Sequence, residues 1–145
     1  MTSTATATAE LLGGVRVLGG RVRDEMDLAR MVEAGLPPQS LQALADHEAV
    51  DLDEVWRLVL PRRTWLHRKA RRQRLTPSES DRASRLARIA ALAAQTFGKP
   101  TPAYTWLHRP CRALGGKVPL TLLGTDAGSR LVEDELTRIE DGVYA

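Results

Sequence analysis

Seven arginine and lysine side chains lie within residues 62–74, a stretch that contains no acidic residue. The rest of the chain is acidic or nearly balanced: residues 1–61 hold five basic residues against ten acidic ones, and residues 75–145 hold nine against eight. The formal net charge of +3 is therefore concentrated in one short block. Positive charge concentrated in this way acts through its local field, and its usual partners are polyanions such as DNA.

On a helical wheel, the basic block divides into a charged half and an apolar half. Trp65, Leu66 and Ala70 fall on the apolar half, which would face a core, and Lys69 alone departs from the division and would have to snorkel. The charged half offers donors for guanine edges and for phosphates in a major groove. The residues predicted to contact DNA are Arg62, Arg63, Thr64, His67, Arg68, Arg71 and Arg72.

The placement of the charges favours a binding role over a purely structural one. Arg62 and Arg63 begin the predicted helix, where the helix dipole disfavours a cation by roughly 0.3–1 kcal/mol. Repulsion among seven like charges adds to that cost. A solvated surface, RNA and anionic lipid remain alternatives, although aromatic platforms for RNA are absent and a membrane-bound helix would carry more bulky apolar residues.

Three short helices are predicted before the basic block. They span about residues 24–34, 39–48 and 51–60, and Pro61 ends the third. The basic helix begins within two residues of Pro61 and is predicted to reach about Arg74. A short helix, a tight turn and a basic helix together form the outline of a helix-turn-helix.

The chain after the basic block is also predicted to be helical. Thr76, Pro77 and Glu79 form a capping-box start for a helix that ends at Phe97. Residues 99–124 are predicted to form short helical pieces, and a last helix runs from about residue 126 to 141. Hydrophobic residues make up 43% of the chain and aromatic residues 4%, so the core must consist of aliphatic side chains. The expected fold class is all-α.

Composition also suggests a division of the chain. Residues 1–20 are rich in Thr, Ala and Gly and are predicted to be a flexible tail. Residues 21–75 are predicted to form the helix-turn-helix domain and residues 76–145 a second helical domain. The chain shows neither a secretory signal nor an apolar run long enough to span a membrane, and Cys111 is its one cysteine, so a cytoplasmic protein is expected.

No combination of residues in the sequence indicates catalysis. His47, His67 and His108 are far apart and show no ligand spacing with another histidine, a cysteine or a carboxylate pair. For His108, a capping or surface role is favoured over a catalytic one. The chain is therefore predicted not to be an enzyme, and to bind no metal and no cofactor.

A series of motifs resembles the Xre/MbcA/ParS antitoxins. Arg63, Thr64 and Arg68 are similar to the recognition-helix region of the Xre-like helix-turn-helix in that family. The motifs of the second half are residues 75–82, Phe97–Gly98, Trp106–Leu107, residues 113–116, Pro119–Leu120, Leu123, Thr125, Gly128, Val132 and the ending 138–145. Two features depart from an ordinary Xre domain, namely Pro61 in the turn and the density of the basic block.

The resemblance implies a fold and a function. Members of the family are all-helical and usually dimeric. Their N-terminal Xre-like helix-turn-helix domain binds the operator DNA of their own operon. A small helical C-terminal domain neutralises a RES-type toxin, which is an NAD-consuming or ADP-ribosyltransferase-like enzyme. A homodimer that joins the toxin in a hetero-oligomer, and binds no membrane, is therefore expected. The alternative is a stand-alone helix-turn-helix regulator whose C-terminal half serves only for dimerisation.

The last turn and the tail after it suggest how the toxin is blocked. A helix end with a projecting tail can fill a cleft, and aromatic and Arg side chains are common interface anchors. Tyr144 is expected either to anchor this tail over the toxin's active site or to pack back on Phe97 or Trp106. Trp106 itself is favoured for the core over the interface. The residues predicted to bind toxin are Trp106, Arg138, Glu140, Val143, Tyr144 and Ala145.

Overall fold

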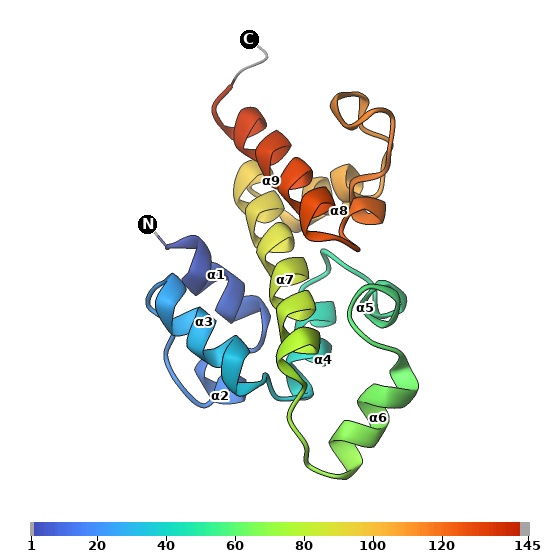
Figure 1. Cartoon of the computed structure of the whole chain (residues 1–145). Coiled ribbons are helices and arrows are strands. Elements are labelled where there is room, and N and C mark those ends of the chain that lie inside the picture. Colours follow the sequence, from blue (N-terminus) through green and yellow to red (C-terminus); the bar gives the residue numbers. More distant parts are fainter. Residues whose placement is uncertain (1, 143–145) are drawn as a thin grey trace.

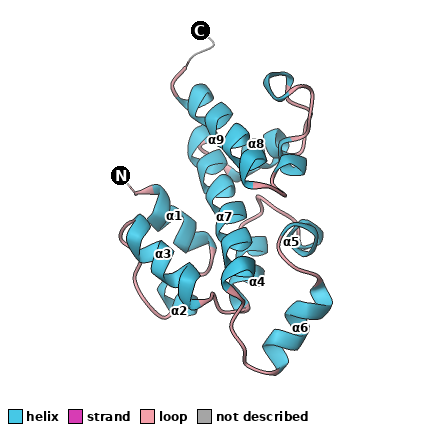
Figure 2. Ribbon diagram, in the orientation of Figure 1, coloured by secondary structure: helices cyan, strands magenta, loops and turns pink. Residues whose placement is uncertain are grey.

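In the computed structural model, residues 2–142 are described, and all regular structure among them is helical (Figure 2). One isolated bridge, between Cys111 and Lys117, is the sole extended pairing in that range. None of these helices has the length and apolar composition needed to cross a membrane. The expected all-α class is confirmed. The α-helices are α1 (Thr4–Leu11), α2 (Gly14–Leu18), α3 (Glu25–Ala34), α4 (Gln39–Asp46), α5 (Leu52–Leu58), α6 (Arg62–Ala70), α7 (Pro77–Phe97), α8 (Pro100–Leu107) and α9 (Asp126–Glu140), and the 3-10 helices are η1 (Arg112–Leu114) and η2 (Pro119–Leu122).

The long helix α7 is the axis of the molecule (Figure 1). Helices α1, α3, α5, α8 and α9 all pack against it. Its buried positions carry mostly alanine, and small side chains let neighbouring helices approach closely. Burial of the larger side chains on that face stabilises the packing by about 1.5–3 kcal/mol each. The buried hydrophobic residues of α7 are Ala83, Leu86, Ala87, Ile89, Ala90, Ala91 and Ala93.

The start of α7 confirms the predicted capping box. The Thr76 hydroxyl accepts a hydrogen bond from the Glu79 backbone N–H at 3.1 Å, and the Glu79 carboxylate accepts one from the Thr76 N–H at 2.8 Å. Pro77 occupies the first turn, where its missing N–H costs nothing. At the other end, Gly98 adopts a left-handed conformation with φ of 74° and closes the helix after Phe97.

The predicted helices before the basic block appear as α3, α4 and α5, with ends within two residues of those expected. The basic helix is shorter than predicted, since α6 ends at Ala70 rather than Arg74. Arg72 is left-handed, with φ of 53°, and the Gln73 N–H turns back to the Arg68 carbonyl at 2.9 Å. The chain must turn here because the Leu75 N–H bonds the Leu36 carbonyl at 2.9 Å.

The predicted flexible tail is wrong, because residues 4–18 form α1 and α2 (Figure 1). Helix α1 packs against α7, and its residues Ala5 and Ala9 are buried together with Leu12. Ser3 caps the helix by accepting a bond from the Thr6 N–H at 3.1 Å. The Thr/Ala composition suggested low complexity, but the positions 5, 9 and 12 have the spacing of one helical face.

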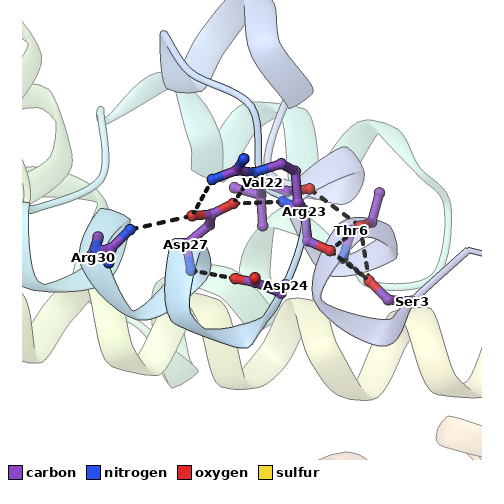
Figure 3. Close-up of polar contacts among 7 residues, drawn as sticks. All are labelled: Ser3, Thr6, Val22, Arg23, Asp24, Asp27 and Arg30. Carbon is purple, nitrogen blue, oxygen red and sulfur yellow. Dashed lines mark hydrogen bonds and ion pairs between the residues drawn. The ribbon is translucent and has the colours of Figure 1, made fainter.

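The segment between α2 and α3 is fastened by the Asp27 carboxylate (Figure 3). It accepts hydrogen bonds from the Arg23 backbone N–H at 3.0 Å and from Arg23 Nε at 2.8 Å, and it lies 3.5 Å from Arg30 Nη1. The Thr6 hydroxyl of α1 donates to the Val22 carbonyl at 3.2 Å. These hydrogen bonds from Arg23, first from its side chain and then from its backbone, lower the pKa of Asp27 from 3.8 to about 2.

Asp27 should make the stability of the protein depend on pH in the acid range. Because its pKa is lower in the folded chain than its ordinary value, its contribution is complete above about pH 4 and is lost as the pH falls towards 2. The variant Asp27→Asn should be less stable at pH 7 and should lose less stability on acidification. Urea unfolding followed by circular dichroism at pH 7, 4 and 2.5 measures both effects. The control variant Asp53→Asn, at an exposed position, should retain the wild-type decline, and an equal decline in Asp27→Asn would contradict this role.

Substitution within the N-terminal helices tests whether they belong to the core. Leu12 is fully buried, so Leu12→Ala should lower the free energy of unfolding by about 2–5 kcal/mol. The matched control Val15→Ala, at a position that is 59% exposed, should change it by less than about 0.5 kcal/mol. Equal small effects in urea unfolding would show that α1 does not contribute to the core.

Candidate functional site

The basic helix α6 follows α5 through a turn at residues 59–61. Arg82 of α7 holds this turn, since its Nε donates a hydrogen bond to the Val59 carbonyl at 2.7 Å. Trp65 is the one buried residue of α6. Its Nε1 donates to the Pro38 carbonyl at 2.7 Å, and its ring lies 5.0 Å from that of Trp56, measured between centroids. One tryptophan thus fixes the position of the basic helix.

The apolar half predicted for α6 is smaller than the helical wheel suggested. Leu66 is 42% exposed and Ala70 is also exposed, so both predictions of a core-facing position are wrong. The reason is visible in Figure 1, where α6 lies at the edge of the bundle and only part of its surface can meet other elements. Lys69 snorkels as predicted, and its Nζ lies 4.4 Å above the Trp65 ring.

Five of the seven residues predicted to contact DNA, four arginines and one histidine, are exposed on and just after α6. Within residues 2–142, their side chains make no ion pair and no side-chain hydrogen bond. Thr64 is half-buried beside them. An exposed set of unpaired cations can bind phosphates or base edges without first breaking internal contacts. The five are Arg62, Arg63, His67, Arg71 and Arg72.

Arg68 differs from the other predicted DNA contacts because it is held within the protein. Its Nε and Nη2 lie 3.2 and 3.1 Å from the two carboxylate oxygens of Glu79, which is a two-point ion pair. Burial alone would raise the pKa of Glu79, but the hydrogen bonds from Arg68 and Thr76 outweigh it and hold that pKa below its usual range. Glu79 therefore caps α7 and also fastens α6, and the sequence indicated only its capping role.

At the other end of α7, Trp106 is half-buried and separates two shallow hollows. Its ring centroid lies 5.9 Å from that of Phe97. The hollows have volumes of about 380 and 430 Å³, and we refer to them together as the Trp106 surface. The first is lined by Phe97, Thr101, Pro102, Thr105, Trp106 and Arg109, and the second by Trp106, Cys111, Arg112, Ala113, Glu135, Arg138 and Ile139.

The remaining residues predicted to bind toxin lie at or near the end of α9. Arg138 is exposed and lines the second hollow, with Nη1 at 3.6 Å from a Glu135 carboxylate oxygen. Glu140 is exposed but accepts a hydrogen bond from the Thr96 hydroxyl at 3.0 Å, outside the Trp106 surface. The structure thus brings together Trp106 and Arg138 of the predicted set. Val143, Tyr144 and Ala145 lie outside the described residues.

A group of polar side chains that the sequence did not reveal joins α5 to α8. Nε2 of His108 lies 2.7 Å from a Glu54 carboxylate oxygen and 3.9 Å from Asp51 Oδ2, and the Tyr104 hydroxyl donates to Asp51 at 3.0 Å. This hydrogen bond to Asp51, together with the nearby negative charges, raises the pKa of Tyr104. Glu54 and His108 are 54 positions apart, so no local spacing could have predicted their contact.

A glycine positions the last helix against the preceding 3-10 helix. A Cβ atom at Gly128 would overlap the Leu122 carbonyl oxygen, so only glycine allows α9 and η2 to approach this closely. The Thr125 hydroxyl caps α9 and accepts a hydrogen bond from the Gly128 N–H at 3.0 Å. This close approach fixes the start of α9 relative to η2.

Comparison with known protein families divides the chain into two parts. Residues 27–88 match the Antitoxin Xre-like helix-turn-helix domain, and residues 92–142 match the Antitoxin Xre/MbcA/ParS C-terminal toxin-binding domain. The two matches meet inside α7, whereas the sequence suggested a boundary just before this helix. The helix-turn-helix match includes α5 and α6, and the C-terminal match includes the Trp106 surface.

Individual relatives agree with these matches. The chain is 39% identical over 84 residues to an antitoxin Xre of Pseudomonas putida. The aligned residues make up 58% of this chain and only 53% of that protein. It is 30% identical over 131 residues to an antitoxin Xre of Yersinia enterocolitica, which covers 78% of this chain and 88% of that protein. A third antitoxin Xre, from Photorhabdus laumondii, is 27% identical over 120 residues. Together with the paired domain matches, these similarities show that the chain belongs to the Xre antitoxin family.

Proposed function

We propose that this chain is the antitoxin of a toxin–antitoxin pair, that α6 binds the operator DNA of its own operon, and that the C-terminal domain neutralises a RES-type toxin by covering its active site. The observation that supports this proposal is that α7 separates an exposed arginine-rich surface from the Trp106 surface. Helix α6, with its exposed arginines, lies towards the N-terminal end of α7, and α8 and α9, which carry the Trp106 surface, lie towards the other end (Figure 1). The family domain matched at each end has the corresponding role.

The geometry of α6 supports docking in a major groove. The groove admits one helix, and α6 projects at the edge of the bundle, where Arg62 and Arg63 make no ion pair with any described residue. Arg63 and His67 are one helical turn apart, so they share a face that can reach base edges. Arg62, Arg71 and Arg72 lie at the two ends of the helix, where they suit phosphate contacts. Arg68 positions α6 through Glu79 in this arrangement.

The Trp106 surface supports toxin binding because it combines apolar side chains with arginines. The lining of its two hollows is largely apolar and includes the exposed arginines Arg109, Arg112 and Arg138. Such a surface fits an apolar segment of the toxin that also carries carboxylates. Residues 143–145, which include Tyr144, follow α9 in the sequence. We propose that the tail covers the entrance of the toxin's active site.

The same apolar surface also fits a second copy of the chain. In that case, the protein would be a stand-alone transcriptional regulator with a C-terminal dimerisation domain, and homodimer formation would bury Trp106. Co-purification with the protein encoded by the neighbouring gene distinguishes the two functions. A stable complex that restores growth supports the antitoxin, whereas a homodimer that ignores the neighbouring protein supports the regulator.

Substitution of Arg63 tests the DNA-binding surface. If Arg63 contacts a base, Arg63→Ala should weaken binding to the operon's promoter fragment by about 1–3 kcal/mol, which is roughly fivefold to 150-fold in Kd. Fluorescence anisotropy at fixed salt concentration measures the change. The control Arg130→Ala, on the exposed part of α9, should bind as the wild type does. Unchanged binding by Arg63→Ala would remove Arg63 from the interface.

A comparison of salt dependence separates base contacts from phosphate contacts. Loss of one phosphate contact, as expected for Arg71→Ala, should lower the slope of log K against log salt by about 1 on every sequence tested. Loss of a base contact should instead be selective for the promoter sequence. If Arg71→Ala changed neither the slope nor the affinity, its cation would not contact DNA.

Two variants test toxin neutralisation in cells that express the neighbouring toxin. Deletion of residues 142–145 should weaken growth rescue while leaving the helical circular dichroism unchanged. Trp106→Ala should also weaken rescue, because it removes the shared wall of both hollows. Arg130→Ala serves again as the matched surface control and should rescue growth fully. Full rescue by the truncated chain would show that the tail does not cover the toxin.

A further inference from the structure

The cluster of Asp51, Glu54, Tyr104 and His108 has an unusual hydrogen-bond arrangement. His108 Nδ1 lies 2.7 Å from the Tyr104 backbone carbonyl oxygen. A carbonyl oxygen can only accept a hydrogen bond, so Nδ1 must carry the proton. In the neutral imidazole, Nε2 then presents a lone pair towards the Glu54 carboxylate, only 2.7 Å away.

Two lone pairs at that distance repel each other unless a positive charge lies with them. A second proton on His108 would supply the charge, and so would a metal ion held by the same atoms. A ring that donates Nδ1–H to a backbone carbonyl and leaves Nε2 free is the arrangement of a metal-binding histidine. The ligand atoms of Asp51, Glu54 and His108 all lie within 4.8 Å of one another.

The surroundings of the three side chains hold them in place. The Glu54 residue is 8% exposed, and its other oxygen accepts the Asp51 backbone N–H at 2.8 Å. The Tyr104 hydroxyl orients Asp51, and the Tyr104 ring stacks on the His108 ring at a centroid distance of 3.8 Å. Hydrogen bonds and stacking of this kind orient the ligands of protein-bound metals.

We propose that Asp51, Glu54 and His108 bind one divalent transition-metal ion, with Zn²⁺ as the best-fitting ion. One imidazole nitrogen and two carboxylate oxygens are ligands that zinc accepts, and the two carboxylates balance its charge. A tetrahedral ion with bonds of about 2.0–2.2 Å separates its ligands by about 3.3–3.6 Å. The 2.7 Å contact of His108 with Glu54 must therefore widen and the 3.9 Å contact with Asp51 must shorten when the ion binds. Water takes the fourth position.

The proposed ion joins the two domains of the chain. Asp51 and Glu54 belong to the helix-turn-helix match, whereas His108 belongs to the C-terminal match. An ion held by both would clamp the N-terminal end of α5 to the C-terminal end of α8. This clamp goes beyond the proposed antitoxin function and does not depend on which toxin or operator the chain binds.

Zinc titration of the full chain tests the site. The protein is purified without a histidine tag, treated with EDTA and dialysed, and Zn²⁺ is added in a calorimeter. The wild type should bind one Zn²⁺ per chain, and its Tm should rise by several degrees with Zn²⁺. His108→Gln should lose the binding and the Tm shift, while His47→Gln, at an exposed histidine outside the cluster, should retain both.

If His108→Gln folds poorly, Tyr104→Phe tests the site independently. Tyr104→Phe removes only the hydroxyl that orients Asp51, and it should weaken Zn²⁺ binding by roughly tenfold. Equal Zn²⁺ affinity in the wild type and both variants would mean adventitious surface binding and would overturn the proposal. No Zn²⁺ uptake by the folded wild type would also overturn it, and would leave the contact of His108 with Glu54 as a structural link between α5 and α8.

Discussion

Five helices pack against α7, and this packing sets where the basic helix and the Trp106 surface lie. The alanine-rich face of α7 lets α1, α3, α5, α8 and α9 approach closely, and larger side chains such as Leu86 and Ile89 fill the spaces between them. Because both family domains share α7, neither can be removed without exposing part of its buried surface. The 21 residues of α7 extend over about 30 Å, which separates the basic helix from the Trp106 surface.

The basic helix α6 shows how function conflicts with folding. Its cations repel one another and two of them lie at its N-terminus, yet Trp65 is its only buried residue. The Trp65–Pro38 hydrogen bond, the Arg68–Glu79 ion pair and the bond from Arg82 to Val59 hold it to the rest of the chain. This arrangement suits a surface whose positive charges are neutralised by a bound polyanion. Binding to a polyanion would also explain why so few of these cations form ion pairs within the described residues.

The sequence predicted most of the helices because their signals are local. Thr76 and Glu79 marked the start of α7, and the predicted start of the last helix at about residue 126 agrees with α9. It failed where distant contacts decide the structure. The Thr/Ala-rich start of the chain folds because Leu12 and its neighbours pack on α7, and α6 ends early because Leu75 must pair with Leu36. The contact of His108 with Glu54 and the pairing of Arg68 with Glu79 likewise depend on tertiary packing, so no spacing in the sequence could indicate them.

In the proposed function, one chain holds DNA at one end of α7 and the toxin at the other. An electrophoretic mobility assay on the promoter fragment, with the purified antitoxin–toxin complex in place of the free chain, tests it most directly. Because the two surfaces do not overlap, a slower-migrating species that contains DNA, antitoxin and toxin is expected. Release of the toxin by DNA, or of DNA by the toxin, would contradict it and would place both partners on one surface.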